Sequence, residues 1–153
     1  MKNQPKPGQI VLMASGAVML IFSFFAFVSL NAFGASKDFS AWSGDAFFPL
    51  SWWPVLFGVI IAGVVAVGVF ADVKLPSEVL TFNWKQIYFV LAFTSFVILV
   101  SFLLFDFSNS FDRGIGYWFM LLASIGLIVG SVMELMDKSS TSGQSGQGPA
   151  TPF

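Results

Sequence analysis

The residue types that most enzymes and metal sites need are missing from this sequence. It contains no histidine and no cysteine. This chain alone therefore cannot build a Ser-His-Asp triad, a thiolate nucleophile, a bis-histidine haem or a histidine- or cysteine-ligated zinc site. The remaining candidates for acid–base chemistry are four carboxylates between the apolar segments: Asp38, Asp45, Asp106 and Asp112. Nothing in their spacing requires two of them to meet, so we expect no catalytic constellation, no cofactor and no metal site.

Four long apolar segments must position these carboxylates. Hydrophobic residues make up 56% of the 153 residues and charged residues only 10%, against about 25% charged in a soluble domain. All seven Lys and Arg and all eight Asp and Glu lie outside these segments, as expected because a charge at the bilayer centre costs at least about 2.5 kcal/mol. A spanning helix needs about 20 apolar residues. The predicted spans are residues 9–33, 53–71, 86–105 and 115–133. The sequence therefore predicts an all-α, four-helix transmembrane bundle.

The distribution of basic residues predicts the orientation of this bundle. Five of the seven lie on the side that carries both termini: Lys2, Lys6, Lys74, Lys85 and Lys138. Only Lys37 and Arg113 lie on the other side. Because basic residues favour the cytoplasmic side, we expect a plasma-membrane protein with both termini in the cytoplasm. Its parts are a head (1–8), a four-span membrane domain (9–136) and a disordered cytoplasmic tail (137–153) rich in Ser, Gly, Gln and Pro.

The aromatic residues and the connections fit the same topology. Every Trp and Tyr lies near the end of a predicted span, as in an interfacial aromatic belt. Pro76 and the apolar pattern that follows it predict a short interfacial helix near residues 75–85, between the second and third spans. The residues of the outer connections that are most open to a functional role are Trp42, Asp45, Asp112 and Arg113.

Small residues recur at helical spacing in two spans. They are Gly58, Ala62 and Ala66 in the second span and Ala123, Gly126 and Gly130 in the fourth. Such residues let helix backbones approach closely. The two faces therefore pack the helices of the bundle against one another, or they bind another membrane protein or a second copy of the chain. Internal packing is the simpler interpretation, because a four-helix bundle has its own interfaces to fill.

Polar groups inside the spans are hydroxyls, which can donate to the carbonyl one turn back in their own helix. They are Ser15, Ser23, Ser29, Thr94, Ser95, Ser101, Ser124 and Ser131. The deepest ionisable residue is Glu134, one turn before Asp137 and Lys138. We expect the Glu134 side chain to extend into cytoplasmic water, with a role in transport as the alternative.

Three stretches of the sequence carry a more specific pattern. They are Ala41–Asp45 with Phe48–Leu50, Val73–Pro76 with Val79–Trp84 and Gln86, and Asp112–Trp118 continuing through Leu121–Ala123 to Gly130. Together they resemble small four-span integral membrane proteins of actinobacteria that have no assigned activity. The resemblance covers about residues 8–136. It implies a plasma-membrane protein of a Gram-positive-type bacterium, and it implies no catalytic residues.

These observations lead to three hypotheses about function. The first is a non-enzymatic interaction protein or accessory subunit of a cell-envelope or membrane complex, favoured by the missing catalytic groups and the small-residue faces. The second is a small oligomeric channel or transporter for an uncharged solute or a lipid, favoured by the hydroxyls. The third is a membrane enzyme that depends on the four carboxylates. A net charge of −1 provides no basic surface for nucleic acid, so the expected partners are the lipid bilayer and another membrane protein or a second copy.

Overall fold

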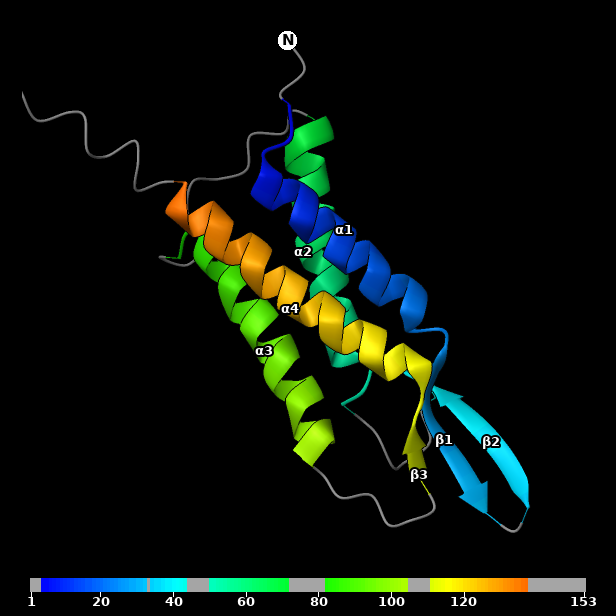
Figure 1. Ribbon diagram of the computed structural model, residues 1–153. Helices are drawn as coiled ribbons and strands as arrows, with labels where there is room; N and C mark the ends of the chain where they lie inside the picture. The colour runs from blue at the N-terminus through cyan, green and yellow to red at the C-terminus, as the bar shows by residue number, and fades with distance from the viewer. Residues whose placement is uncertain (1–3, 33, 44–49, 72–81, 105–110, 138–153) are drawn as a thin grey trace, which may run out of the picture.

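The computed structural model describes residues 4–32, 34–43, 50–71, 82–104 and 111–137. Within these residues the chain forms four helices and a small three-stranded sheet (Figure 1). The helices are α1 (Pro7–Phe22), α2 (Trp53–Phe70), α3 (Trp84–Leu104) and α4 (Ile115–Met136), and the strands are β1 (Ala26–Ala32), β2 (Ala35–Ser40) and β3 (Phe111–Arg113). The ends of α2, α3 and α4 lie within about three residues of the ends predicted for the last three spans, close to the usual uncertainty of helix boundaries.

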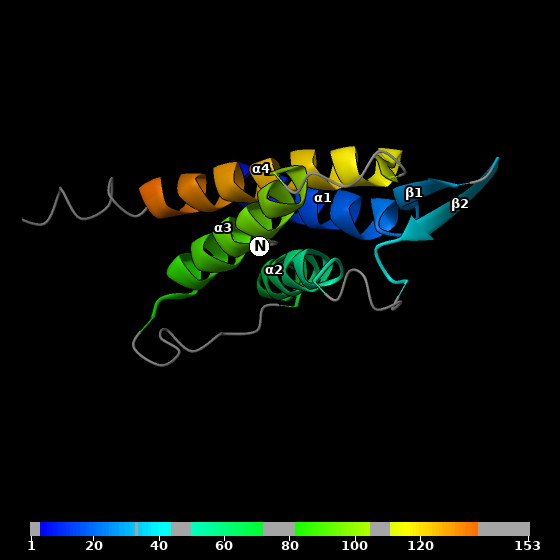
Figure 2. The same cartoon turned by 90° about the horizontal axis from the view of Figure 1, so that it is seen from below.

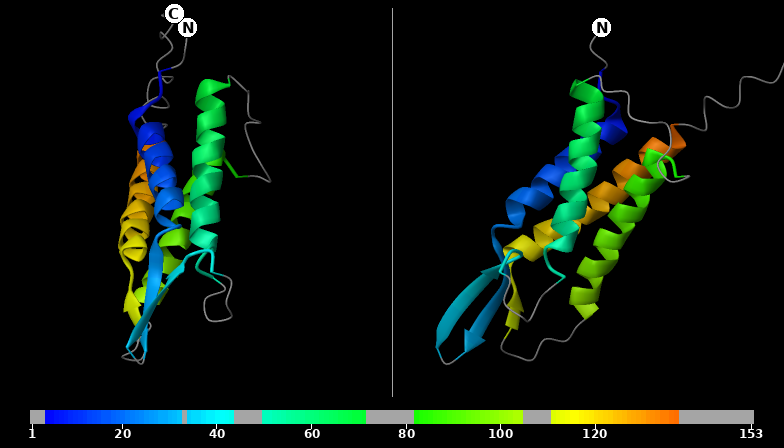
Figure 3. Two further views of the ribbon diagram at one scale, coloured as in Figure 1. Left: turned by 90° about the vertical axis from the view of Figure 1, so that its right-hand side faces the viewer. Right: turned by 180° about the vertical axis from the view of Figure 1, so that it is seen from behind.

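The four helices alternate in direction and enclose a shared core. α1 lies between α4 and α2, and α3 packs against both α4 and α2 (Figures 2 and 3). One end of the bundle gathers the start of α1, the end of α2, the start of α3 and the end of α4, and we call it the terminal end (Figure 1). The opposite end carries the strands, and we call it the sheet end. All four helices contribute side chains with no exposed surface, among them Leu12, Ile61, Leu99 and Leu127.

Three of the helices in the described residues, α2, α3 and α4, are long and apolar enough to cross a membrane. Large apolar side chains remain exposed on their outward faces, including Ile60, Val90, Phe93, Leu122 and Val129. So many exposed large apolar side chains on helices are unusual for a soluble protein and suit contact with lipid. The 16 residues of α1 make a helix of about 24 Å, which is shorter than the ~30 Å hydrocarbon core of a bilayer. The fold is therefore compatible with a membrane protein.

The first predicted span, residues 9–33, is wrong in its second half. α1 ends at Phe22, and β1 pairs with β2 on one side and with β3 on the other, both antiparallel. Hydropathy alone does not distinguish a buried strand from a helix, but residues 28–31 alternate apolar and polar, as a strand does. Both neighbouring strands supply backbone hydrogen bonds, so β1 satisfies its polar groups without helical geometry. The fold is mostly helical with a small sheet, and the all-α prediction is corrected accordingly.

The register of the sheet separates its charged residues by sign. Ser29 at the centre of β1 lies opposite Asp38 of β2 and Asp112 of β3. Residues directly opposite one another point to the same face of a sheet, so the two carboxylates lie on the same face as Ser29. Lys37 and Arg113 are the chain neighbours of these two aspartates, and side chains alternate along a strand. Both cations therefore point to the other face.

Two glycines at the start of α4 let the sheet approach the bundle closely. A Cβ atom on Gly114 would clash with the carbonyl of Ala26, and one on Gly116 would lie 2.7 Å from the carbonyl oxygen of Phe22. The backbone N–H of Gly114 donates to the carbonyl of Phe27 at 3.0 Å. The beginning of α4 is therefore fixed to the end of α1 and the start of β1 through the backbone, where no side chain fits.

Some predictions concern parts of the chain outside the described residues. Asp45, Asp106, most of the interfacial helix near residues 75–85 and the tail after Asp137 belong to this group. Their predicted roles stay predictions.

Candidate functional site

The small residues of α2 lie against α1. A Cβ atom on Gly16 of α1 would lie 2.5 Å from the Cβ of Ala62 and 2.6 Å from the carbonyl oxygen of Gly58. Ala66, one turn further along α2, is half-buried. This face therefore brings the α1 and α2 backbones together, as small residues do between helices.

The GxxxG pair of α4 lies against the other side of α1. A Cβ atom on Gly126 would meet the hydroxyl of Ser15, and one on Gly130 would lie 2.9 Å from Cγ of Leu12. Ala123, one turn earlier, is only 5% exposed. Both small-residue faces thus contribute to contacts within the bundle, and a role in binding a second protein stays a prediction.

The hydroxyls within α3 and α4 satisfy themselves on their own helices. Thr94 donates to the Val90 carbonyl at 2.8 Å and Ser95 to the Leu91 carbonyl at 2.9 Å. Ser101, Ser124 and Ser131 each donate to the carbonyl three residues earlier. A hydroxyl held in this way does not point its donor toward a solute pathway.

At the sheet end, the predicted outer residue Asp112 joins Asp38 on one polar surface. The Ser29 hydroxyl donates to Asp38 Oδ1 at 2.6 Å, and Asn31 Nδ2 donates to Asp112 Oδ2 at 2.9 Å. We call these four residues the acidic sheet face. Both aspartates are exposed, so their carboxylates can accept hydrogen bonds from a cationic partner. The chain has no histidine, so any proton transfer on this face would depend on the two carboxylates.

The other two predicted outer residues tie the sheet end to the helices. Trp42 Nε1 donates to the Ser23 hydroxyl, just after α1, at 2.8 Å. Arg113 Nη2 donates to the carbonyl oxygen of Leu103 at 2.8 Å, in the last turn of α3. A cation that binds the unpaired carbonyls at a helix C-terminus also complements the helix dipole. Trp42 and Arg113 are thus explained as structural contacts.

The terminal end contains a polar cluster centred on Glu134, near the end of α4. Its side chain is only 6% exposed, and Lys85 Nζ lies 3.8 Å from its Oε2 atom. The same Nζ donates to the Glu134 backbone carbonyl at 2.7 Å. The prediction that Glu134 extends into water is wrong, because α1 covers the side chain. A Cβ atom on Gly8 would lie 3.1 Å from Glu134 Oε1, so the carboxylate occupies the space that this glycine leaves.

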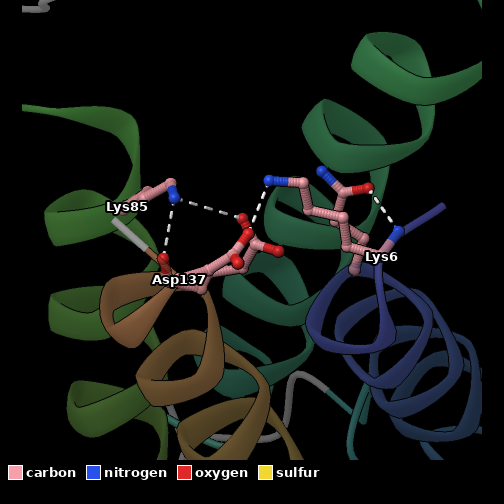
Figure 4. A network of polar contacts seen from close by, with 5 residues as sticks. Lys6, Lys85 and Asp137 are labelled. Carbon is pink, nitrogen blue, oxygen red and sulfur yellow. Dashed lines mark hydrogen bonds and ion pairs between the residues drawn. The ribbon is translucent and has the colours of Figure 1, made fainter. Parts of the chain in front are cut away.

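A second ion pair closes the terminal end from the side of α1. Lys6 Nζ lies 2.5 Å from Asp137 Oδ2, and Figure 4 shows Lys6 and Lys85 extending toward the end of α4 from opposite sides. The hydrogen bond and the charge of Asp137 raise the pKa of Lys6 above its usual range. The same hydrogen bond and the charge of Lys6 lower the pKa of Asp137. Both groups therefore favour their charged forms in the folded chain.

Two clefts open beside Glu134. One, of about 430 Å³, lies between the start of α1 and the end of α4. Its polar lining is Lys6, Glu134 and Asp137, with Pro7, Gly8, Met133 and Met136 as the apolar part. The other, of about 210 Å³, lies among the four helices at the same end. Its polar and aromatic lining is Gln9, Asn83, Trp84, Lys85, Tyr88 and Glu134.

This cluster is not among the features expected from the sequence, although the sequence contains a partial signal for it. Glu134 and Asp137 are three residues apart, so they share one face of a helix. The predicted topology already placed Lys6 and Lys85 on the same side of the membrane as both carboxylates. The missing information was that α1 and α3 flank the end of α4, which depends on packing between distant segments.

Comparisons with protein-family models, with curated proteins and with solved structures found no match for this chain. The function must therefore be argued from the residues and the geometry of the two ends.

Proposed function

We propose that the chain is a multi-pass integral membrane protein that acts as a non-enzymatic accessory subunit of a cell-envelope or membrane complex. In this proposal the four helices span a bacterial plasma membrane with both termini in the cytoplasm, and the chain belongs with the small four-span actinobacterial proteins that it resembles. The sheet end then faces the outside of the cell. In the sequence, five of the seven basic residues precede the first helix, lie between α2 and α3 or near the start of α3, or follow α4, and this distribution supports the orientation.

The observation that carries the proposal is the acidic sheet face. The sheet projects from the bundle, away from the terminal end (Figure 1). It displays Asp38 and Asp112 on one surface, and both are exposed. Such a surface suits a partner that presents Lys, Arg or amide groups, because complementary charges guide association and fix orientation.

The polar groups of the helices support an accessory role over a channel or an enzyme. The hydroxyls of α3 and α4 donate to their own helices, and the small residues of α2 and α4 pack on α1. On the sheet, each aspartate accepts a hydrogen bond from a neutral neighbour. This arrangement orders the surface and gives no activated nucleophile.

Site-specific photo-crosslinking in native membranes tests the proposal. A photoreactive residue at Asn31 lies on the acidic sheet face, and the same residue at Lys37 lies on the opposite face and is the matched control. We expect a stoichiometric partner crosslinked from position 31 and not from position 37, and lost in the Asp38→Asn, Asp112→Asn double variant. Absence of a partner from both positions would overturn the accessory role. A discrete homo-oligomer as the sole product would favour the channel hypothesis instead.

A further inference from the structure

The Glu134 side chain is almost fully covered, but its carboxylate oxygens open onto the two clefts and are not buried groups without a partner. Within the part of the chain that the structure describes, no hydrogen bond ends on its oxygens, and Lys85 Nζ, its ion-pair partner, is 3.8 Å away. Lys85 donates instead to the Glu134 backbone carbonyl. A carboxylate that lines a cleft keeps lone pairs for donors that enter the cleft. The carboxylate lines both clefts, so a bound cation with N–H donors could donate hydrogen bonds to it.

The clefts also carry positive charge at a short distance from this carboxylate. Lys6 lines the larger cleft and Lys85 the smaller one, and they approach the end of α4 from opposite sides (Figure 4). With Glu134 and Asp137, the cluster holds two cations and two anions. It is therefore complementary to a ligand that itself carries one ammonium and one phosphate group, and it has no net preference for a purely anionic ligand.

The position of the clefts indicates where such a ligand comes from. Both lie at the terminal end, and the smaller one is lined by Trp84 and Tyr88, which belong to the aromatic belt expected at a membrane boundary. Met133 and Met136 provide an apolar wall in the larger cleft. A phospholipid headgroup lies at this level of a bilayer with its acyl chains against apolar side chains, which favours a lipid over a soluble ligand.

We propose that the terminal end binds the headgroup of a zwitterionic phospholipid with a primary amine. The ammonium donates hydrogen bonds to Glu134, and the phosphate accepts from Lys6 or Lys85. A trimethylammonium headgroup has no N–H donor, and an anionic headgroup without an amine offers the Glu134 carboxylate no ammonium donor. The inference rests on the membrane insertion proposed above and does not depend on the accessory role.

Retention of defined lipids by the purified full-length protein tests the inference. The protein is reconstituted in vesicles with equal amounts of phosphatidylethanolamine, phosphatidylcholine and phosphatidylglycerol of identical acyl chains, extracted gently and examined by native mass spectrometry. We expect phosphatidylethanolamine to be retained about tenfold over the other two, the preference that one charge-assisted hydrogen bond supplies. Equal retention of phosphatidylcholine would overturn the proposal.

Two variants locate the site. Glu134→Gln keeps the size of the side chain but removes its charge, and we expect it to abolish the preference, whereas Asp112→Asn at the sheet end leaves it unchanged. The Cβ atom of a Gly8→Ala variant would lie 3.1 Å from Glu134 Oε1 and would narrow the larger cleft. We expect this variant to weaken lipid retention as well. It provides a second test of the site if Glu134→Gln does not fold. An undiminished preference in a folded Glu134→Gln variant would exclude this site.

A soluble competitor distinguishes a lipid headgroup from a free amine phosphate, because both carry the same ammonium and phosphate groups. Free phosphoethanolamine at millimolar concentration should not displace the lipid, because the acyl chains contribute to binding. Displacement would assign the site to a soluble amine phosphate and overturn the lipid assignment. These measurements use the purified protein alone. Their outcome therefore does not depend on whether the chain has a protein partner.

Discussion

The two ends of the molecule both gather charged residues, but they do so in opposite ways. At the sheet end, Asp38 and Asp112 are exposed and accept hydrogen bonds from neighbours on the adjacent strand. At the terminal end, Glu134 is buried, and Lys85, its partner, comes from a different helix. The charged residues are therefore solvated and bonded to a neighbouring strand at the sheet end, and linked between helices at the terminal end.

This difference predicts where substitutions are tolerated. Exposed charges on a sheet contribute little to stability, because water and salt screen them. A buried carboxylate cannot lose its partner without leaving a charge in a low-dielectric site. The sheet end should thus tolerate changes of charge but not of backbone spacing, and the terminal end should be sensitive to charge.

The largest effect is expected for Gly114→Ala, where the sheet joins α4. The new Cβ would overlap the carbonyl of Ala26, and backbone atoms cannot move aside as a side-chain tip can. We expect the free energy of unfolding to fall by about 3 kcal/mol or more, measured by titrating detergent-solubilised protein with a denaturing detergent and following helical circular dichroism.

Gly63→Ala is the matched control for this prediction. Nothing lies within 4 Å of a Cβ at that position in the described residues, and alanine favours a helix over glycine by roughly 1 kcal/mol. The control should therefore be neutral or slightly stabilising. Equal losses in both variants would show that the tight junction at Gly114 does not limit stability.

The second effect compares carboxylates at the two ends. Glu134→Gln should lower the free energy of unfolding by about 1–3 kcal/mol, because Lys85 loses the charge that faces it. Asp112→Asn, which is exposed, should change it by less than about 0.5 kcal/mol. The same denaturing titration measures both variants. Similar losses of unfolding free energy in the two would show that the ends do not differ in their sensitivity to charge.

Hydropathy predicted the helices well and the sheet not at all. The ends of α2, α3 and α4 follow from where apolar runs meet charged residues, and these limits are local. The end of α1 is not local. It depends on Gly114 and Gly116, some 90 residues later in the chain by the printed numbering, which provide the space for the backbone of residues 22–26. The apolar sequence of residues 9–33 by itself gives no indication of that contact.

The candidate sites show the same limit. Asp112 and Arg113 are adjacent in the sequence and were both candidates for a functional role in an outer connection, but the strand register sends their side chains to opposite faces. The position of Glu134 suggested an exposed carboxylate. Gly8 reverses that interpretation because it lets α1 cover the side chain. In both cases the sequence gives the type of residue. The surroundings of its side chain depend on a distant segment that packs against it, which the sequence alone does not show.

The third effect tests the anchoring of α4 to α3 near the sheet end. The Tyr117 hydroxyl donates to the carbonyl oxygen of Leu99 at 2.8 Å, and the side chain is 1% exposed. Tyr117→Phe should lower the free energy of unfolding by about 1 kcal/mol, since a buried hydrogen bond between α4 and α3 is lost. Trp118→Phe, at a neighbouring exposed position, is the control and should change it less. A larger effect at Trp118 would contradict this assignment.

The smallest effect concerns the pH dependence of the Lys6–Asp137 pair. Lys6 and Asp137 side chains are 57% and 43% exposed, so the pair contributes little. The pKa of Asp137 is lowered from 3.8, so its contribution is present above that pH and lost as pH falls through the lower folded value. The pKa of Lys6 is raised from 10.5, so its contribution is complete below that pH and lost as pH rises through the higher folded value.

Comparing wild type with Asp137→Asn isolates this pair from the other titrating groups. The difference in unfolding free energy between the two proteins should be constant near neutral pH and shrink as pH falls through the lowered pKa of Asp137, because protonated aspartic acid and asparagine are both neutral. A difference that persists unchanged in acid would mean that Asp137 acts through its shape and hydrogen bonding. The terminal end would then depend on the buried Glu134 alone for its sensitivity to charge, and the contrast with the sheet end would rest on one residue.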